Sequence, residues 1–140
     1  MFVVRTAGEV LDSAVVSSLE FAVDTLHTSL VVVLGHEHCG AIQSAVAALS
    51  PLDEERLDEL DRLVTDSPSP IIRSVGGSVL ESRRAGLDDT DDFERVHIAR
   101  TIERLVTESE SISAALGEGR LRIVGARYRV SDGVVEVLSF

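Results

Sequence analysis

The sequence predicts an α/β domain with a largely parallel β-sheet flanked by helices, and three observations lead to this fold class. Residues 30–34 are apolar at every position and rich in valine, which is typical of a parallel strand covered on both faces. Apolar residues recur at helical spacing on either side of that strand. Two apolar runs around Asp132-Gly133 predict a C-terminal hairpin. A length of 140 residues fits a single domain over residues 1–140.

The first half of the chain predicts a strand and two helices around residues 30–34. Residues 2–4 are apolar and lead into a polar loop, so they predict a short first strand. Residues 13–26 predict a helix whose first turn is capped by Asp12 or Ser13. Residues 40–49 predict a second helix, which a proline soon afterwards ends.

The second half predicts two helices and a further strand. Residues 54–64 carry their apolar side chains on one stripe among acidic ones, which predicts an amphipathic surface helix. Residues 87–92 predict an acidic loop. A helix over residues 91–108 follows, because its first residue is paired with Glu94 in a capping motif. Residues 121–125 predict the strand that precedes the hairpin.

The composition excludes several classes of function. The chain has 24 acidic residues and 13 basic ones, all arginine, which gives a net charge of −11. Such a charge repels phosphate backbones and anionic lipid, so we expect no nucleic-acid partner and no membrane partner. The longest apolar run, residues 30–34, is far shorter than the roughly 20 residues of a membrane helix. The single cysteine, Cys39, rules out an internal disulfide, and the amino end carries no signal segment, so we expect a cytoplasmic protein.

The densest cluster of reactive side chains lies in residues 35–40, where the buried strand turns into the next helix. Sites in open parallel sheets gather at the carboxyl ends of strands. His36 and Cys39 are close enough in sequence to reach one metal ion from a tight turn, and imidazole with thiolate is a favoured zinc pair. The helix that begins after Cys39 favours a thiolate at its amino end. We therefore identify His36 and Cys39 as candidate metal ligands.

Two ligands do not complete a zinc site, which needs three or four protein donors. Glu37 or His38 could contribute, although adjacent side chains on so short a turn usually diverge. A thiol nucleophile or redox centre at Cys39 is an alternative interpretation, but the chain has no resolving cysteine. His27 and His97 lie in or beside helices and are expected to be solvated or satisfied within the core.

Long stretches of the sequence follow the order and spacing of one known family. They are residues 2–8 (FVVRTAG), 18–23 (SLEFAV), 32–41 (VVLGHEHCGA), 100–105 (RTIERL), 119–128 (GRLRIVGARY) and 132–135 (DGVV). In these motifs the chain resembles the β-class carbonic anhydrases over nearly its whole length, except for a middle region over residues 51–92.

The resemblance implies a zinc enzyme, a lyase that reversibly hydrates carbon dioxide to bicarbonate and a proton. His36 and Cys39 match the family's histidine and second cysteine ligands, and Zn²⁺ would lower the pKa of a bound water toward ~7. The family also implies a homodimer or higher homo-oligomer. In the family, the loop that contains Arg5, Ala7 and Gly8 borders the active site, although an ordinary turn at the end of a strand explains the same residues.

The chain departs from the family at its amino end. The family's Cys-x-Asp-x-Arg motif supplies the other cysteine ligand and an aspartate-arginine pair, and nothing in these residues matches it. The resemblance therefore implies an N-terminally incomplete domain that lacks the first central strand, and we expect a start codon placed too late. We expect this chain alone to be weak or inactive. The alternative is a catalytically inactive carbonic-anhydrase-like subunit that acts through protein-protein association along its open sheet edge.

Overall fold

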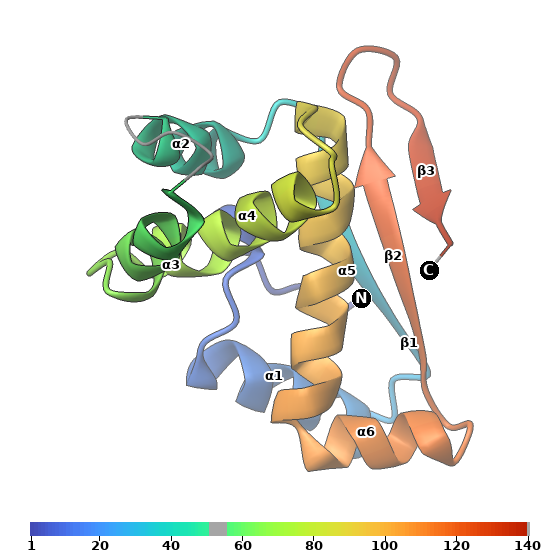
Figure 1. The fold of residues 1–140 in the computed structure, drawn as a ribbon. Coiled ribbons are helices and arrows are strands. Elements are labelled where there is room, and N and C mark those ends of the chain that lie inside the picture. The colour runs from blue at the N-terminus through green and yellow to red at the C-terminus, as the bar shows by residue number, and fades with distance from the viewer. Residues whose placement is uncertain (51–55, 140) are drawn as a thin grey trace.

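The computed structural model describes residues 1–50 and 56–139, which form helices packed against a small sheet (Figure 1). The helices are α1 (Ser13–Asp24), α2 (Gly40–Leu49), α3 (Leu57–Thr65), α4 (Gly77–Arg84), α5 (Thr90–Glu108) and α6 (Glu110–Gly117). The strands are β1 (Leu30–His36), β2 (Arg122–Tyr128) and β3 (Val135–Leu138). A 3₁₀ turn, η1 (Ala7–Glu9), precedes α1, and a π-helical turn, η3 (Ile72–Gly76), leads into α4.

The sheet is mixed and has the strand order β1-β2-β3. β1 and β2 are parallel, with Leu30 opposite Arg122 and His36 opposite Tyr128. β2 and β3 are antiparallel and form the predicted hairpin. The α/β fold class predicted from the sequence is confirmed, with one parallel pair and one antiparallel pair in the described sheet.

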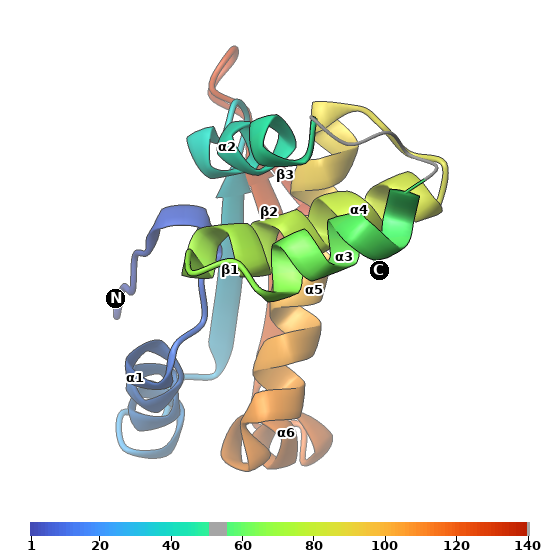
Figure 2. The same cartoon turned by 60° about the vertical axis from the view of Figure 1, so that its left-hand side comes forward.

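Helix α5 runs along the sheet and joins two apolar clusters (Figures 1 and 2). Toward its C-terminal end, Leu105 packs with residues of α1, β1 and α6 such as Val23, Val31 and Ile112. Toward its N-terminal end, Phe93 packs with α2, α3, η3 and α4. In the part of the chain that the structure describes, no helix is both long and apolar enough to cross a membrane.

The two faces of β1 differ, which corrects the prediction that helices cover both of them. Val31 is 9% exposed and Gly35 is buried, on the face that α5 covers. Leu30, Val32 and Leu34 are 50 to 51% exposed on the opposite face. The sequence shows that both faces of β1 are apolar. In the part of the chain that the structure describes, helices pack on one of these faces.

Several predicted elements are confirmed, and others are wrong. Residues 40–49 form α2 and residues 91–108 lie within α5, but residues 2–4 form no strand. A strand needs a hydrogen-bonded neighbour, and in residues 1–50 and 56–139 residues 2–4 have none. Of the predicted helix over residues 54–64, positions 54 and 55 lie outside the described residues, and the rest corresponds to α3.

The middle of the chain holds more helix than the sequence predicted. Helix α4 begins at Gly77, in a region for which no helix was predicted. The predicted acidic loop is shortened because α5 begins at Thr90, and its cap is Asp89 rather than Asp91. The Asp89 carboxylate accepts a hydrogen bond from the Asp91 N–H at 2.8 Å, as an N-cap does.

Candidate metal-binding turn between β1 and α2

The candidate ligands lie at the two ends of a tight turn. His36 is the last residue of β1, and Cys39 immediately precedes α2. The Glu37 N–H donates to the Tyr128 carbonyl at 2.8 Å, which continues the pairing of β1 with β2 for one more residue. His38 has φ 60°, and this left-handed backbone reverses the chain direction. The sequence prediction of a tight turn from a strand into a helix is confirmed.

The two candidate ligands have different surroundings. The His36 side chain is exposed and lies beside Tyr128 in the sheet register, on the face that α5 leaves uncovered. Cys39 is only 7% exposed and belongs to the apolar cluster that contains Ile42 and Val75. Among the other residues of the turn, Glu37 is half-buried and His38 is exposed.

A buried ion pair between β2 and α5 holds the backbone of the turn in place. Arg127 on β2 and Glu94 on α5 are 1% and 2% exposed, and Arg127 Nε donates to Glu94 Oε2 at 2.6 Å. The other Glu94 oxygen accepts a hydrogen bond from the Cys39 N–H at 3.4 Å. Arg127 Nη2 also donates to Asp91 at 2.5 Å. Strand β2 and helix α5 thus hold the backbone of Cys39 through one chain of hydrogen bonds.

Electrostatics keep this arginine charged. Burial by itself would lower the pKa of Arg127, but the hydrogen bond that Arg127 donates to Glu94 and the charges of Glu94, Asp91 and Glu37 outweigh it and raise the pKa above its ordinary value. The Glu37 carboxylate also accepts a hydrogen bond from the Ser131 N–H at 2.9 Å, and hydrogen bonding by Ser131 lowers the pKa of Glu37. The β2–β3 hairpin is thereby tied to the turn.

Gly35 allows α5 to approach the end of β1. A Cβ atom at this position would lie 2.7 Å from Ile98 Cδ1 and 2.9 Å from the Glu9 carboxylate. Glu9 Oε2 is buried and has no hydrogen-bond partner among the described residues. Desolvation, followed by the charge of Glu94, raises the pKa of Glu9 to about 7. The covered side of the turn therefore contains a second buried carboxyl group that the sequence analysis did not single out.

The loop singled out at residues 5–8 lies against α2. The side chains of Arg5 and Ala7 are exposed, whereas Gly8 is buried, and a Cβ on it would lie 3.0 Å from Cβ of Ala41. Gly8 has φ 66°. Its carbonyl accepts a hydrogen bond from His97 Nε2 at 2.7 Å.

The other two histidines lie where the sequence analysis expected them. His97 is 3% exposed and is hydrogen-bonded in the core to Ser78 Oγ at 2.8 Å as well as to the Gly8 carbonyl. Burial is the main cause that lowers the pKa of His97. His27 is exposed in the turn after α1.

The residues that the structure describes do not provide a full set of metal donors around His36 and Cys39. Within residues 1–50 and 56–139, no group of three His, Cys, Asp or Glu side chains is placed to hold one metal ion. His36 and Cys39 fit zinc in donor type, but two protein donors fall short of the three or four that zinc sites use. His36 and Cys39 therefore fit part of a zinc site.

The sequence analysis did not identify Arg127 and Glu94 as parts of the site. Glu94 was interpreted only as part of a helix cap, and Arg127 lay beyond the predicted strand over residues 121–125 and was named only within the family motif of residues 119–128. A signal was present, because a charged residue in an otherwise apolar buried strand requires a buried partner of opposite charge.

Comparisons with known proteins agree with this architecture. A family model described as carbonic anhydrase matches residues 1–135. The carbonic anhydrase of Mycolicibacterium smegmatis is 44% identical over 139 residues, which cover 99% of this chain and 63% of that protein. Carbonic anhydrase 2 of Mycobacterium tuberculosis is 42% identical over 133 residues, which cover 95% of this chain and 60% of that protein. The chain thus spans about three-fifths of the length of these relatives.

Solved structures show the same fold. A Coccomyxa β-carbonic anhydrase in complex with acetazolamide superimposes with a TM-score of 0.72 at 21% identity, covering 98% of this chain and 60% of that chain. One of two tetrameric β-carbonic anhydrases from Sordaria macrospora gives a TM-score of 0.64 at 17% identity, covering 94% of this chain and 62% of that chain.

Proposed function

This chain belongs to the carbonic anhydrase family, and from that premise we propose that it supplies two zinc ligands, His36 and Cys39, to a centre that reversibly hydrates carbon dioxide to bicarbonate. The observation that carries the proposal is the turn between β1 and α2. It joins an exposed imidazole to a buried thiol across two residues, at the carboxyl end of a parallel strand.

Zinc in a complete site supplies a water-derived nucleophile at neutral pH. The described residues offer two of the donors that such a site needs. The part of this chain is to hold His36 and Cys39 in place. The Glu94–Arg127 pair fixes the Cys39 backbone, and the pairing of Glu37 with Tyr128 fixes the end of β1. The remaining donors then come from a segment with the family's Cys-x-Asp-x-Arg motif, outside the described residues.

We assign the loop of Arg5, Ala7 and Gly8 to the border of the same site. Gly8 contacts Ala41 at the start of α2, close in sequence to Cys39. The exposed Arg5 offers a cation that could face the substrate entrance, and its replacement by glutamine tests that role.

Stopped-flow hydration of carbon dioxide, followed with a pH indicator, tests the proposed function. The 140-residue chain is compared with the product of the same gene extended upstream to any in-frame Cys-x-Asp-x-Arg. We expect at least a hundredfold higher turnover from the extended product, and loss of that turnover in its Cys39→Ser variant. A stop codon directly upstream, with no turnover by the chain at any zinc concentration, would overturn the proposal.

A second candidate function is a catalytically inactive subunit that acts through association. It is favoured by the uncovered face of β1, where Leu30, Val32 and Leu34 are half exposed. Under either candidate we propose that a second copy of this chain covers the face, in a homodimer or a higher assembly such as the tetrameric Sordaria relatives. Concentration-dependent assembly without any hydration activity selects the second candidate, and activity that is lost on Cys39→Ser excludes it.

We also propose a cytoplasmic location and a small neutral or anionic substrate, carbon dioxide or bicarbonate. The single free cysteine is buried and fits a reducing compartment. The net charge of −11 disfavours nucleic acid and anionic membranes as partners.

A further inference from the structure

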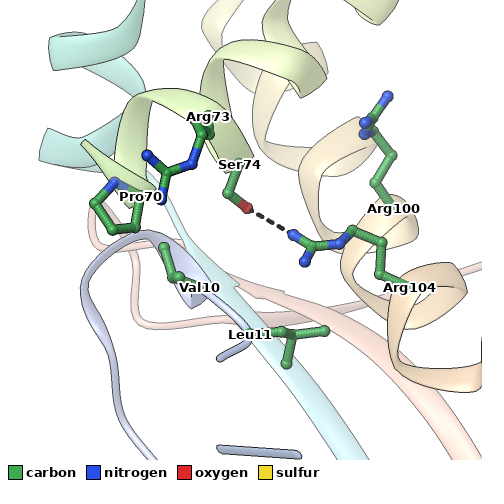
Figure 3. A pocket seen from close by; sticks show the side chains of 7 residues that line it. All are labelled: Val10, Leu11, Pro70, Arg73, Ser74, Arg100 and Arg104. Carbon is green, nitrogen blue, oxygen red and sulfur yellow. Dashed lines mark hydrogen bonds between the residues drawn. The ribbon is translucent and has the colours of Figure 1, made fainter. Parts of the chain in front are cut away.

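A cavity of about 310 Å³ lies away from the turn, between the segment that precedes α1, η3 and α5 (Figure 3). The residues that line it are Val10, Leu11, Pro70, Arg73, Ser74, Arg100 and Arg104. Neither candidate zinc ligand is among them, so whatever this cavity binds is independent of the proposed metal centre.

Two arginines and a hydroxyl group line the cavity, with Arg73 extending toward Pro70 and Arg104 toward Ser74 (Figure 3). Arg104 Nη1 donates to Ser74 Oγ at 3.3 Å, and Figure 3 shows its guanidinium turned toward Ser74. Arg73 extends from the same turn as Ser74. The guanidinium of Arg100 turns away from Ser74 in Figure 3, and it pairs with Glu81. Arg73 and Arg104 are therefore the two cations that a ligand would meet.

Both cations have donors to offer. Arg73 Nη1 donates to the Ser67 carbonyl, and within residues 1–50 and 56–139 it pairs with no carboxylate. Arg104 donates to Glu108 Oε1 from Nε at 3.0 Å and from Nη2 at 2.8 Å, so the second hydrogens of Nη1 and Nη2 are the donors it has left for a ligand. Its pair with Glu108 is 37% and 41% exposed, and exposed pairs contribute little. Because Ser74 Oγ accepts from Arg104, its own proton is free for a bound anion. An incoming anion can thus take hydrogen bonds from all three groups.

Val10 and Leu11 form an aliphatic wall across the cavity from Ser74 and Arg104, and the Pro70 ring lies beside Arg73 (Figure 3). A free phosphate ion would fill only part of 310 Å³ and leave this wall uncovered. A molecule with one anionic end and one apolar end matches both walls. The arginines also make this cavity a local positive region on a chain with net charge −11, which concentrates anions there.

We propose that this cavity binds a small phosphorylated organic molecule, with its phosphate between Arg73, Arg104 and Ser74 and its organic part against Val10 and Leu11. Planar guanidinium groups match phosphate oxygens in two-point hydrogen bonds, and the serine hydroxyl supplies a third donor. The site involves no residue of the proposed metal centre, so it stands or falls separately from the proposed function.

Isothermal titration calorimetry at constant ionic strength tests this site, with phenyl phosphate, inorganic phosphate and phenol as probes. We expect saturable binding of phenyl phosphate, at least about threefold tighter than inorganic phosphate, and no saturable binding of phenol. The double variant Arg73→Gln, Arg104→Gln should bind phenyl phosphate at least about tenfold more weakly. Arg120→Gln is the matched control, because Arg120 is an exposed arginine outside the cavity, and its affinity should stay within about twofold of wild type.

Circular dichroism and the melting temperature confirm that both variants are folded, which is expected because the substituted side chains are at least partly exposed. Absence of saturable binding to wild type overturns the proposal. So does equal affinity in the folded double variant, which would mean adventitious anion binding only. Inorganic phosphate that binds as tightly as phenyl phosphate would refute the role of the aliphatic wall.

Discussion

The two faces of the sheet at the end of β1 are completed to different degrees. On the face toward α5, Gly35 and Arg127 are buried, and Arg127 pairs with Glu94. On the other face, His36 is exposed and Leu34 is 51% exposed. The chain thus builds a rigid frame beneath the candidate ligands but leaves their open side uncovered. If the proposed centre forms here, this chain fixes the backbone of His36 and Cys39, and residues 1–50 and 56–139 supply no third donor beside them.

The largest expected effect comes from breaking the frame with Arg127→Met. This change leaves the Glu94 carboxylate buried without its cation, so we expect the free energy of unfolding to fall by about 3–5 kcal/mol. Urea denaturation followed by circular dichroism measures it. Arg129→Met is the control, because its pair with Asp132 is 40% and 46% exposed and should contribute less than about 1 kcal/mol. Equal losses in the two variants would contradict the frame.

The next effect depends on pH and concerns Glu9, on the covered side. Its pKa is about 7 in the folded chain, against an ordinary value of 4.5 in the unfolded chain, so above pH 4.5 the unfolded chain releases this proton more readily than the folded one. Stability from this group is therefore complete below pH 4.5 and is lost as the pH rises to about 7. Relative to Glu9→Gln, wild type should lose about 3 kcal/mol between about pH 4 and about pH 8.

Comparison with Glu9→Gln isolates this effect from His97. The lowered pKa of His97 makes stability fall as the pH drops below 6.5, the opposite direction, and both proteins contain that histidine. Urea midpoints at several pH values provide the measurement. Parallel stability curves for the two proteins would mean that the Glu9 carboxyl is not desolvated.

Gly35→Ala should give a smaller loss. The new Cβ would lie 2.7 Å from Ile98 and push α5 away from β1, so we expect a cost of about 1–3 kcal/mol in unfolding free energy. Gly117→Ala is the matched control, since a Cβ there meets nothing within 4 Å. A Gly35→Ala protein as stable as the control would show that the approach of α5 is not tight.

The smallest effect on stability is expected on the uncovered face. Val32 is 50% exposed, so Val32→Glu should change the unfolding free energy of the monomer by about 1 kcal/mol or less. The same change should shift the association equilibrium toward monomer, because it puts a charge on the face that we propose a second copy covers. Sedimentation equilibrium measures this shift, with Leu116→Glu on α6 as the control for an exposed apolar residue elsewhere. Unchanged association would place the interface on another surface.

Local sequence signals predicted the elements that depend on local interactions. Helix α2, the hairpin and the turn that holds His36 and Cys39 follow from glycine positions, apolar spacing and an Asp-Gly turn. The strand predicted for residues 2–4 was wrong, because an apolar run forms a strand only beside a partner strand. Helix α4 was not predicted because Gly76 and Gly77 are poor helix formers. In the fold, Val75 and Val79 are buried in an apolar cluster, and these tertiary contacts stabilise the helix.

The buried Arg127–Glu94 pair could not be predicted from local sequence signals either, because it depends on tertiary packing. Arg127 and Glu94 are 33 positions apart, and only the packing of α5 on β2 brings them together. Glu9 is far from Gly35 in sequence, and only the fold brings its carboxylate beside that glycine. The candidate ligands were proposed from the sequence because imidazole and thiolate are donors that zinc favours, whereas burial and charge pairing require the fold.

Zinc content after exhaustive dialysis tests most directly whether His36 and Cys39 are two ligands of a site that this chain alone leaves incomplete. For the 140-residue chain we expect well below one zinc per chain. The product extended to a Cys-x-Asp-x-Arg motif should retain about one, and its Cys39→Ser variant should lose it. One zinc retained by the 140-residue chain, or an extended product whose zinc survives both Cys39→Ser and His36→Ala, would contradict this assignment.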